Sequence, residues 1–267
     1  MSNPPRADLT GWTCAPFTGG GFTHDVYRRG SGPGVVLIPE MPGLTPEVLA
    51  LGNHLVDNGF TVASPSLYGT PGAAAQRRGA VPVLLRGCVT REFAAFATDK
   101  KRPVTYFLRA LARDLNESTA GKGVGIIGQC WSGGFALAAA VDDVVLAPVL
   151  SQPSLPLAVT AAQRGDPGLS EDELMVVERR AKEDGLCALG LRFSADRMSP
   201  SERFQTLRNR LGDAFEVIEI DSRPGNSGGF GKMAHSVLTL EVRDVEGQQA
   251  YQARERVVQF LKERLTV

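Results

Sequence analysis

The feature that most constrains the fold is the alternation of short apolar runs with segments of helical periodicity. Short runs at 34–39, 60–64, 124–127, 144–147, 188–193 and 215–220 are predicted strands. The runs at 34–39 and 60–64 are continuous in apolar character, which is typical of strands buried on both faces. Helical spacing is found at 45–58, 103–116, 135–141, 170–184, 199–211 and 248–265. This alternation predicts βαβ units and a mostly parallel, doubly wound α/β sheet.

Local signals sharpen this prediction at the ends of several elements. Gly19–Gly21 favours a tight turn in an N-terminal hairpin whose second arm is Thr23–Arg28. Ser170 with Glu173 forms a capping-box pattern at the start of a helix. No linker or internal repeat divides the chain, so we expect residues 1–267 to form a single domain.

Composition narrows the class of protein. The chain has 267 residues with 29 Lys and Arg against 29 Asp and Glu, so it lacks the basic excess of a nucleic-acid-binding protein. No apolar run approaches the roughly 20 residues of a membrane span, and the first residues show no secretory pattern. The four cysteines are far apart and favour neither a zinc site nor a disulfide scaffold. We therefore expect a cytoplasmic protein without metal or organic cofactor, and without nucleic-acid or membrane partners.

The most informative motif is Gly128–Gly134, which directly follows a predicted strand and opens a predicted helix. A nucleophile at such a sharp turn has small residues two positions to either side, and Gly128 and Ser132 flank Cys130 in this way. The start of the helix stabilises a thiolate and offers N–H groups to an oxyanion. Ser132 is a competing nucleophile, because Cys130 and Gly134 are its small flanking residues. Strand register favours Cys130, since the run ends at Ile127–Gly128.

A base and an acid are expected at the same edge of the sheet, because ligands of parallel sheets bind at the carboxyl ends of the strands. His235 lies in a glycine-rich loop after the last predicted strand, and Asp196 comes just after the strand 188–193. The order Cys130, Asp196, His235 is that of α/β-hydrolase triads. Asp196 could instead cap the next helix, but Ser199 is an alternative cap.

With these motifs the chain resembles the dienelactone hydrolase family, from about Val35 to Leu265. The resemblance rests on Gly128–Trp131, Asp196, His235 and Pro39–Gly43. It implies an α/β-hydrolase fold, and it implies that Glu40 contacts the resting cysteine. Family enzymes that act on dienelactone bind its carboxylate through arginines, one of them four residues beyond the histidine. That position is Thr239 here, so Arg86 or Arg91 are the alternatives, and both could equally be surface residues.

Together these patterns predict a hydrolase of small carboxylic esters or lactones, acting as a monomer or homodimer. His235 would activate Cys130, Asp196 would orient the imidazole, and a thioester would form. The N–H groups of Trp131 and Met41 would hold the oxyanion, and Tyr68 would line the substrate pocket. Two alternatives stay open: a serine esterase that uses Ser132, and a catalytically silent binding or regulatory protein with the same fold.

Overall fold

The computed structural model describes residues 8–74 and 97–266. The described residues form a sheet of eight strands in the order β1-β2-β4-β3-β5-β6-β7-β8. The strands are β1 (Thr13–Gly19), β2 (Phe22–Gly30), β3 (Gly34–Ile38), β4 (Thr61–Pro65), β5 (Val124–Gln129), β6 (Val145–Ser151), β7 (Ala188–Phe193) and β8 (Phe215–Ile220). The strands from β4 to β8 are parallel to one another, whereas β1 and β2 run antiparallel at one edge. This is the α/β-hydrolase fold with its N-terminal hairpin, as the sequence predicts.

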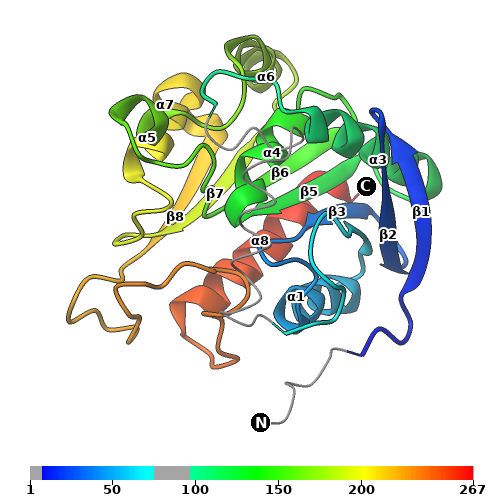
Figure 1. Ribbon diagram of the computed structural model, residues 1–267, viewed down its shortest axis with the longest axis horizontal. Helices are drawn as coiled ribbons and strands as arrows, with labels where there is room; N and C mark the ends of the chain where they lie inside the picture. Colours follow the sequence, from blue (N-terminus) through cyan, green and yellow to red (C-terminus); the bar gives the residue numbers. More distant parts are fainter. Residues whose placement is uncertain (1–7, 75–96, 267) are drawn as a thin grey trace.

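Helices cover both faces of the sheet (Figure 1). They are α1 (Pro46–Asp57), α3 (Pro103–Ser118), α4 (Gly133–Ala139), α5 (Ala161–Gly165), α6 (Glu171–Glu183), α7 (Ser201–Leu211) and α8 (Gln249–Leu265), with 3-10 turns η1 (Cys130–Ser132) and η2 (Gly212–Ala214). One apolar core joins the sheet to α3, α4, α6 and α7, and a second core joins its other face to α1 and α8. None of the helices in the described ranges has both the length and the apolar character that crossing a bilayer requires.

Side-chain caps begin several of the helices. Thr45 caps α1, and Ser170 and Glu173 form the predicted capping box of α6, with Ser170 N donating to the Glu173 carboxylate at 3.0 Å. The predicted cap at Ser199 is wrong. Helix α7 begins at Ser201 after Pro200, which gives no side-chain cap, and the Ser199 carbonyl accepts a hydrogen bond from Arg192 instead.

The parallel strands all end at one edge of the sheet, and the loops that follow β3, β5, β6 and β7 meet there. Ile38 of β3 pairs with Gly128 of β5, and Gln129 pairs with Ser151 at the end of β6. Ser151 in turn pairs with Leu191 of β7. The residues that follow these strand ends therefore include Glu40, Cys130, Gln152 and Asp196, which places polar groups from distant parts of the chain along one edge.

Candidate active site

Cys130 lies at a tight turn between β5 and the 3-10 turn that leads into α4. Its φ of 52° is in the left-handed region, which non-glycine residues rarely adopt. Two positions earlier, a Cβ on Gly128 would lie 2.2 Å from the carbonyl oxygen of Ser132, so the turn requires glycine there. Cys130 is 8% exposed. The strand-to-helix turn predicted from the sequence is therefore present, with Cys130 at its sharpest point.

The hydroxyl of Ser132 is engaged inside this turn. It accepts a hydrogen bond from Gln129 N at 2.9 Å, and it lies 2.8 Å from the Gln129 carbonyl oxygen, to which it can donate. The carbonyl oxygens of Ile38 and Pro39 lie 3.3 and 3.2 Å away as further acceptors. Ser132 is fully buried. Its hydroxyl thus fastens the turn to the end of β3.

The structure brings His235 and Asp196 together, as the predicted order requires. Nδ1 of His235 lies 2.7 Å from Oδ2 of Asp196, and both side chains are largely buried. The other oxygen of Asp196 accepts a hydrogen bond from Met198 N at 2.9 Å. One oxygen of Asp196 therefore shapes its own loop and the other binds the imidazole, and Asp196 does not cap α7, whose N-cap position is Pro200.

The electrostatics of His235 link it to Cys130. Burial lowers the pKa of the imidazole, but negative charge on Cys130 and the hydrogen bond with Asp196 outweigh burial and raise the pKa to about 11. Nε2 of His235 is buried, and interaction with the Cys130 side chain is among the causes that raise the pKa. With Nδ1 engaged by Asp196, Nε2 is the ring atom left for Cys130, and the raised pKa favours the protonated imidazole.

Glu40 is buried just beyond β3, but its hydrogen bonds are not to Cys130. Oε2 accepts from Ser236 Oγ at 2.8 Å and from Gln152 Nε2 at 3.2 Å, and Oε1 accepts from Thr239 Oγ1. Burial raises the pKa of the Glu40 carboxyl, and these donors together with the charge of His235 oppose that rise. The resemblance implies a contact with the resting cysteine, whereas this carboxylate is held by the segment that follows His235.

Of the remaining predicted site residues, three lie in the described part of the chain near Cys130 and two lie outside it. Trp131 is buried in the 3-10 turn, and partly buried Met41 packs against the core that contains Cys130 and Trp131. Burial raises the pKa of the Tyr68 phenol, and negative charge on Cys130 and Glu40 raises it further, so Tyr68 lies near both groups. Its hydroxyl donates to the carbonyl of Pro39. Arg86 and Arg91 lie outside the described residues.

Sequence reasoning missed Gln152, Ser236 and the part that Thr239 plays. Gln152 is fully buried at the carboxyl end of β6 and has a φ of 35°. The available signal was a polar residue directly after a buried apolar run, which is the position that yielded Cys130 and Asp196. Ser236 and Thr239 follow the histidine, but nothing in their spacing indicates which side chain they contact.

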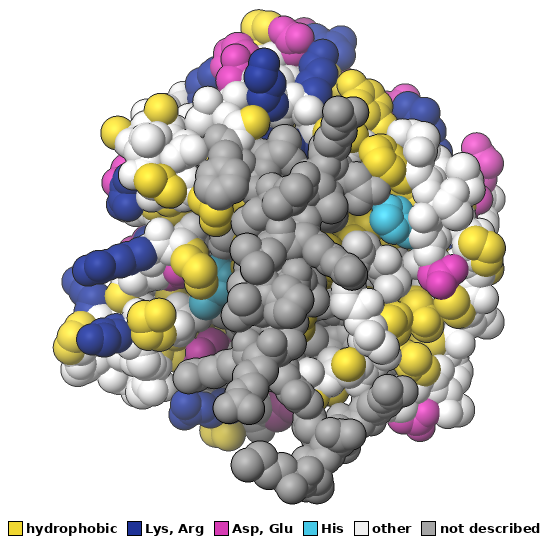
Figure 2. All heavy atoms as spheres, viewed as in Figure 1, with side chains coloured by type: hydrophobic (Ala, Val, Ile, Leu, Met, Phe, Trp, Pro, Cys, Tyr) yellow, Lys and Arg dark blue, Asp and Glu magenta, His cyan; other side chains and the backbone are white. Residues whose placement is uncertain are grey.

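A pocket of about 440 Å³ opens beside Asp196. It is lined by Ala195, Asp196, Arg197, Met198, Lys232 and Met233. Met198 and Met233 are 50% and 81% exposed. Arg197 and Lys232 are both exposed among these lining residues. In Figure 2, Lys, Arg and hydrophobic side chains lie together at the left of the view, next to a histidine.

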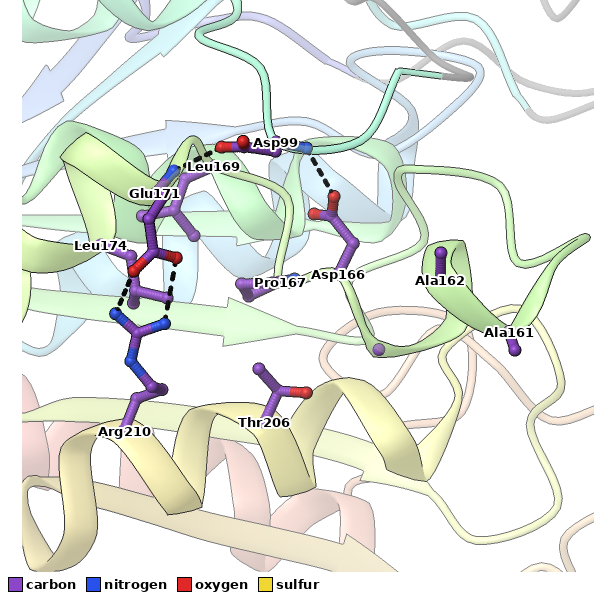
Figure 3. Close-up of a pocket in the computed structure, with 11 residues that line it drawn as sticks. Asp99, Ala161, Ala162, Asp166, Pro167, Leu169, Glu171, Leu174, Thr206 and Arg210 are labelled. Carbon is purple, nitrogen blue, oxygen red and sulfur yellow. Dashed lines mark hydrogen bonds and ion pairs between the residues drawn. The ribbon is translucent and has the colours of Figure 1, made fainter.

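A second pocket, of about 490 Å³, lies between the start of α6, α5 and α7 (Figure 3). Its charged groups bond to one another. Glu171 makes a two-fold ion pair with Arg210, and Asp166 accepts from the backbone of Asp99 at 2.8 Å. In the described ranges, His, Cys, Asp and Glu side chains form no group of three or more that could hold a metal ion. The polar groups of this pocket therefore bond to one another and stabilise the segments that line it.

Comparison with known proteins identifies the family. Residues 26–265 match the model of the dienelactone hydrolase family. The chain belongs to this family, which is part of the α/β-hydrolase superfamily. Family membership supports classing the chain among hydrolases of carboxylic esters.

Solved structures share the fold at low sequence identity. A dienelactone hydrolase from Anabaena variabilis has a TM-score of 0.60 and 14% identity, covering 95% of this chain and 98% of that one. An esterase from Pyrococcus furiosus has a TM-score of 0.59 and 15% identity, with coverage of 98% and 99%. A dienelactone hydrolase-like promiscuous phosphotriesterase from metagenomic libraries has a TM-score of 0.57 and 16% identity, with coverage of 95% and 98%. A search of curated protein sequences found no match.

Proposed function

We propose that the chain hydrolyses small carboxylic esters or lactones through a thioester on Cys130. The observation that carries this proposal is the buried His235, whose Nδ1 is bound to Asp196 and whose pKa is raised to about 11 in part by charge on Cys130. A thiolate paired with an imidazolium is the reactive form of a cysteine nucleophile. Membership of a hydrolase family supports ester chemistry at this pair.

The reaction follows from these roles. The Cys130 thiolate attacks the ester carbonyl, and the N–H groups of Trp131 and Met41 stabilise the resulting oxyanion. The bond between the carbonyl carbon and the leaving oxygen breaks, and His235 gives its proton to the alcohol. His235 then takes a proton from water, whose oxygen attacks the thioester, and the acid is released with the thiolate restored. Asp196 keeps Nδ1 protonated and stabilises the imidazolium.

The choice between Cys130 and Ser132 is supported by hydrogen bonding. The Ser132 hydroxyl is fully buried and already engaged with Gln129 and with the end of β3. Its use as a nucleophile would break the hydrogen bonds that hold the turn to the end of β3. We therefore expect Cys130→Ala to lower kcat/KM for a small aryl ester at least about 10³-fold, with unchanged far-UV circular dichroism. Ser132→Ala should instead lower the melting temperature. Loss of activity in Ser132→Ala alone, with Cys130→Ala fully active, would overturn the proposal.

A further inference from the structure

Four buried side chains connect the end of β3 to the segment that carries His235. We call them the Glu40 clamp: Glu40, Gln152, Ser236 and Thr239. Glu40 Oε2 accepts from Ser236 Oγ at 2.8 Å and from Gln152 Nε2 at 3.2 Å, and Oε1 accepts from Thr239 Oγ1. Their exposed fractions are 4%, 0%, 7% and 8% in the same order. Ser236 directly follows His235, so the clamp acts on the backbone next to the imidazole.

Gln152 gives the clamp a second attachment to the same segment. While its Nε2 donates to Glu40, its Oε1 accepts from Val237 N at 3.3 Å. The backbone of Gln152 is held in turn, because its N–H donates to the carbonyl of Leu191 in β7 at 2.7 Å. Its φ of 35° is a strained conformation for a side-chain-bearing residue. The hydrogen bonds to Glu40, Val237 and Leu191 together fix the position of this buried, strained glutamine.

The turn after His235 is thereby fixed from both sides. Within it, Thr239 N donates to the carbonyl of Ser236 at 3.3 Å. Asp196 fixes the imidazole through Nδ1, but one hydrogen bond leaves the ring free to swing about that contact. The clamp fixes the chain on which the ring is carried. Both constraints are needed to hold Nε2 in one place, and catalytic efficiency falls steeply when a reacting group is displaced by about 1 Å.

Hydrogen bonds to the buried carboxylate of Glu40 hold the clamp together. A buried carboxylate is expensive unless hydrogen bonds satisfy its oxygens. Each donor supplied by Gln152, Ser236 or Thr239 lowers that cost, so the segment is drawn toward Glu40. Because both oxygens are engaged by these donors, Glu40 has partners that compete with any approach to Cys130.

We propose that Glu40, Gln152, Ser236 and Thr239 are positioning residues that hold His235 against Cys130, and that Glu40 acts through this clamp rather than by contact with the thiol. The proposal rests on the proposed function, because it assigns these residues to the same Cys130–His235 pair. It also gives Thr239 a role of its own: its hydroxyl binds the buried glutamate.

The test compares two substitutions at one position. Thr239→Val keeps the shape of the side chain and removes the hydroxyl donor, whereas Thr239→Ser keeps the donor. Thr105→Val is the matched control, because Thr105 is also buried, in α3, and its hydroxyl donates to the Arg102 carbonyl at 2.7 Å. Two quantities are measured: steady-state kcat and KM for a small aryl ester, and the rate of Cys130 alkylation by iodoacetamide from pH 6 to 9. Peptide mass spectrometry assigns the alkylated residue.

We expect Thr239→Val to lower kcat about tenfold or more with little change in KM, in line with a displaced base. Its rate of Cys130 alkylation should fall below that of the wild type, while Thr239→Ser and Thr105→Val keep the wild-type rate. A wild-type kcat together with a wild-type alkylation rate in Thr239→Val would overturn the clamp. If Thr239→Val does not fold, Ser236→Ala removes the donor to the other carboxylate oxygen and is read in the same way.

Failure of the clamp is distinguishable from failure of the proposed function. Alkylation by iodoacetamide consumes no ester, so its rate reports the Cys130–His235 geometry whether or not the protein hydrolyses esters. A wild type without esterase activity would contradict the proposed function, and the alkylation rates of Thr239→Val and Thr239→Ser would still decide the clamp.

Discussion

At the scale of single residues, the chemistry depends on the charge that His235 carries. Burial alone would favour the neutral imidazole, yet charge on Cys130 and the bond to Asp196 raise its pKa to about 11. The raised pKa favours the protonated imidazole at neutral pH. A protonated imidazole can give its proton to a departing alcohol.

This electrostatic link makes a direct prediction about the pKa of His235. Cys130→Ala removes the neighbouring negative charge, so we expect the pKa of His235 to fall, while Asp196 still holds part of the increase. Nitrogen-detected NMR of the imidazole at pH 8 should show an imidazolium in the wild type and a larger neutral fraction in Cys130→Ala. A pKa unchanged by the substitution would mean that Cys130 is not charged beside the ring.

At the scale of elements, the site is assembled from segments that follow strand ends. The sequence allowed Cys130, Asp196 and His235 to be predicted, because each occupies a loop whose place is set by strand order alone. The bonds of Glu40 could not be predicted, since neither periodicity nor spacing indicates which donors a buried carboxylate meets across the sheet edge. Helix α5 was missed because it has five residues and buries none of them.

The pocket beside Asp196 makes a prediction about substrate preference. Its rim carries Arg197 and Lys232, so an ester with a negative charge remote from its carbonyl should be favoured electrostatically. We expect Arg197→Ala combined with Lys232→Ala to lower kcat/KM for an anionic ester about 3- to 30-fold at low salt, and to change it little for a neutral analogue. Lys182→Ala combined with Arg208→Ala removes the same charge from exposed sites on α6 and α7. Equal losses for both esters would contradict a role in substrate choice.

At the scale of the whole molecule, buried arginines bind the long segments between strands to the rest of the fold. Arg203 of α7 is fully buried and donates to the carbonyl oxygens of Asp166, Pro153, Pro156 and Gln163. It thus fastens the segment between β6 and α6, which begins with Gln152, to a helix on the sheet. The alternation of strands and helices predicted the fold, but an arginine within an amphipathic helix reads as exposed, so this tie was not predictable from the sequence.

Arg203→Met tests the tie as a stability effect. The apolar side chain fills much of the space but leaves buried carbonyl oxygens without a donor, each of which costs about 1–3 kcal/mol. We expect the free energy of unfolding in urea to fall by roughly 3–5 kcal/mol, since part of that cost is relieved by relaxation. Arg208→Met, on an exposed face of the same helix, should change it by less than about 0.5 kcal/mol. Comparable losses in both variants would refute the role assigned to Arg203.

The most direct test of the central claim is to identify the atom that carries the acyl group. The wild-type protein is mixed with an activated aryl ester, quenched in acid within the first turnovers, and digested for peptide mass spectrometry, with His235→Gln as the comparison. We expect the acyl mass on Cys130 in the wild type, sensitive to hydroxylamine as a thioester is, and much less of it in His235→Gln. An acyl group on Ser132, or hydrolysis at full rate in a Cys130→Ala protein, would contradict the account.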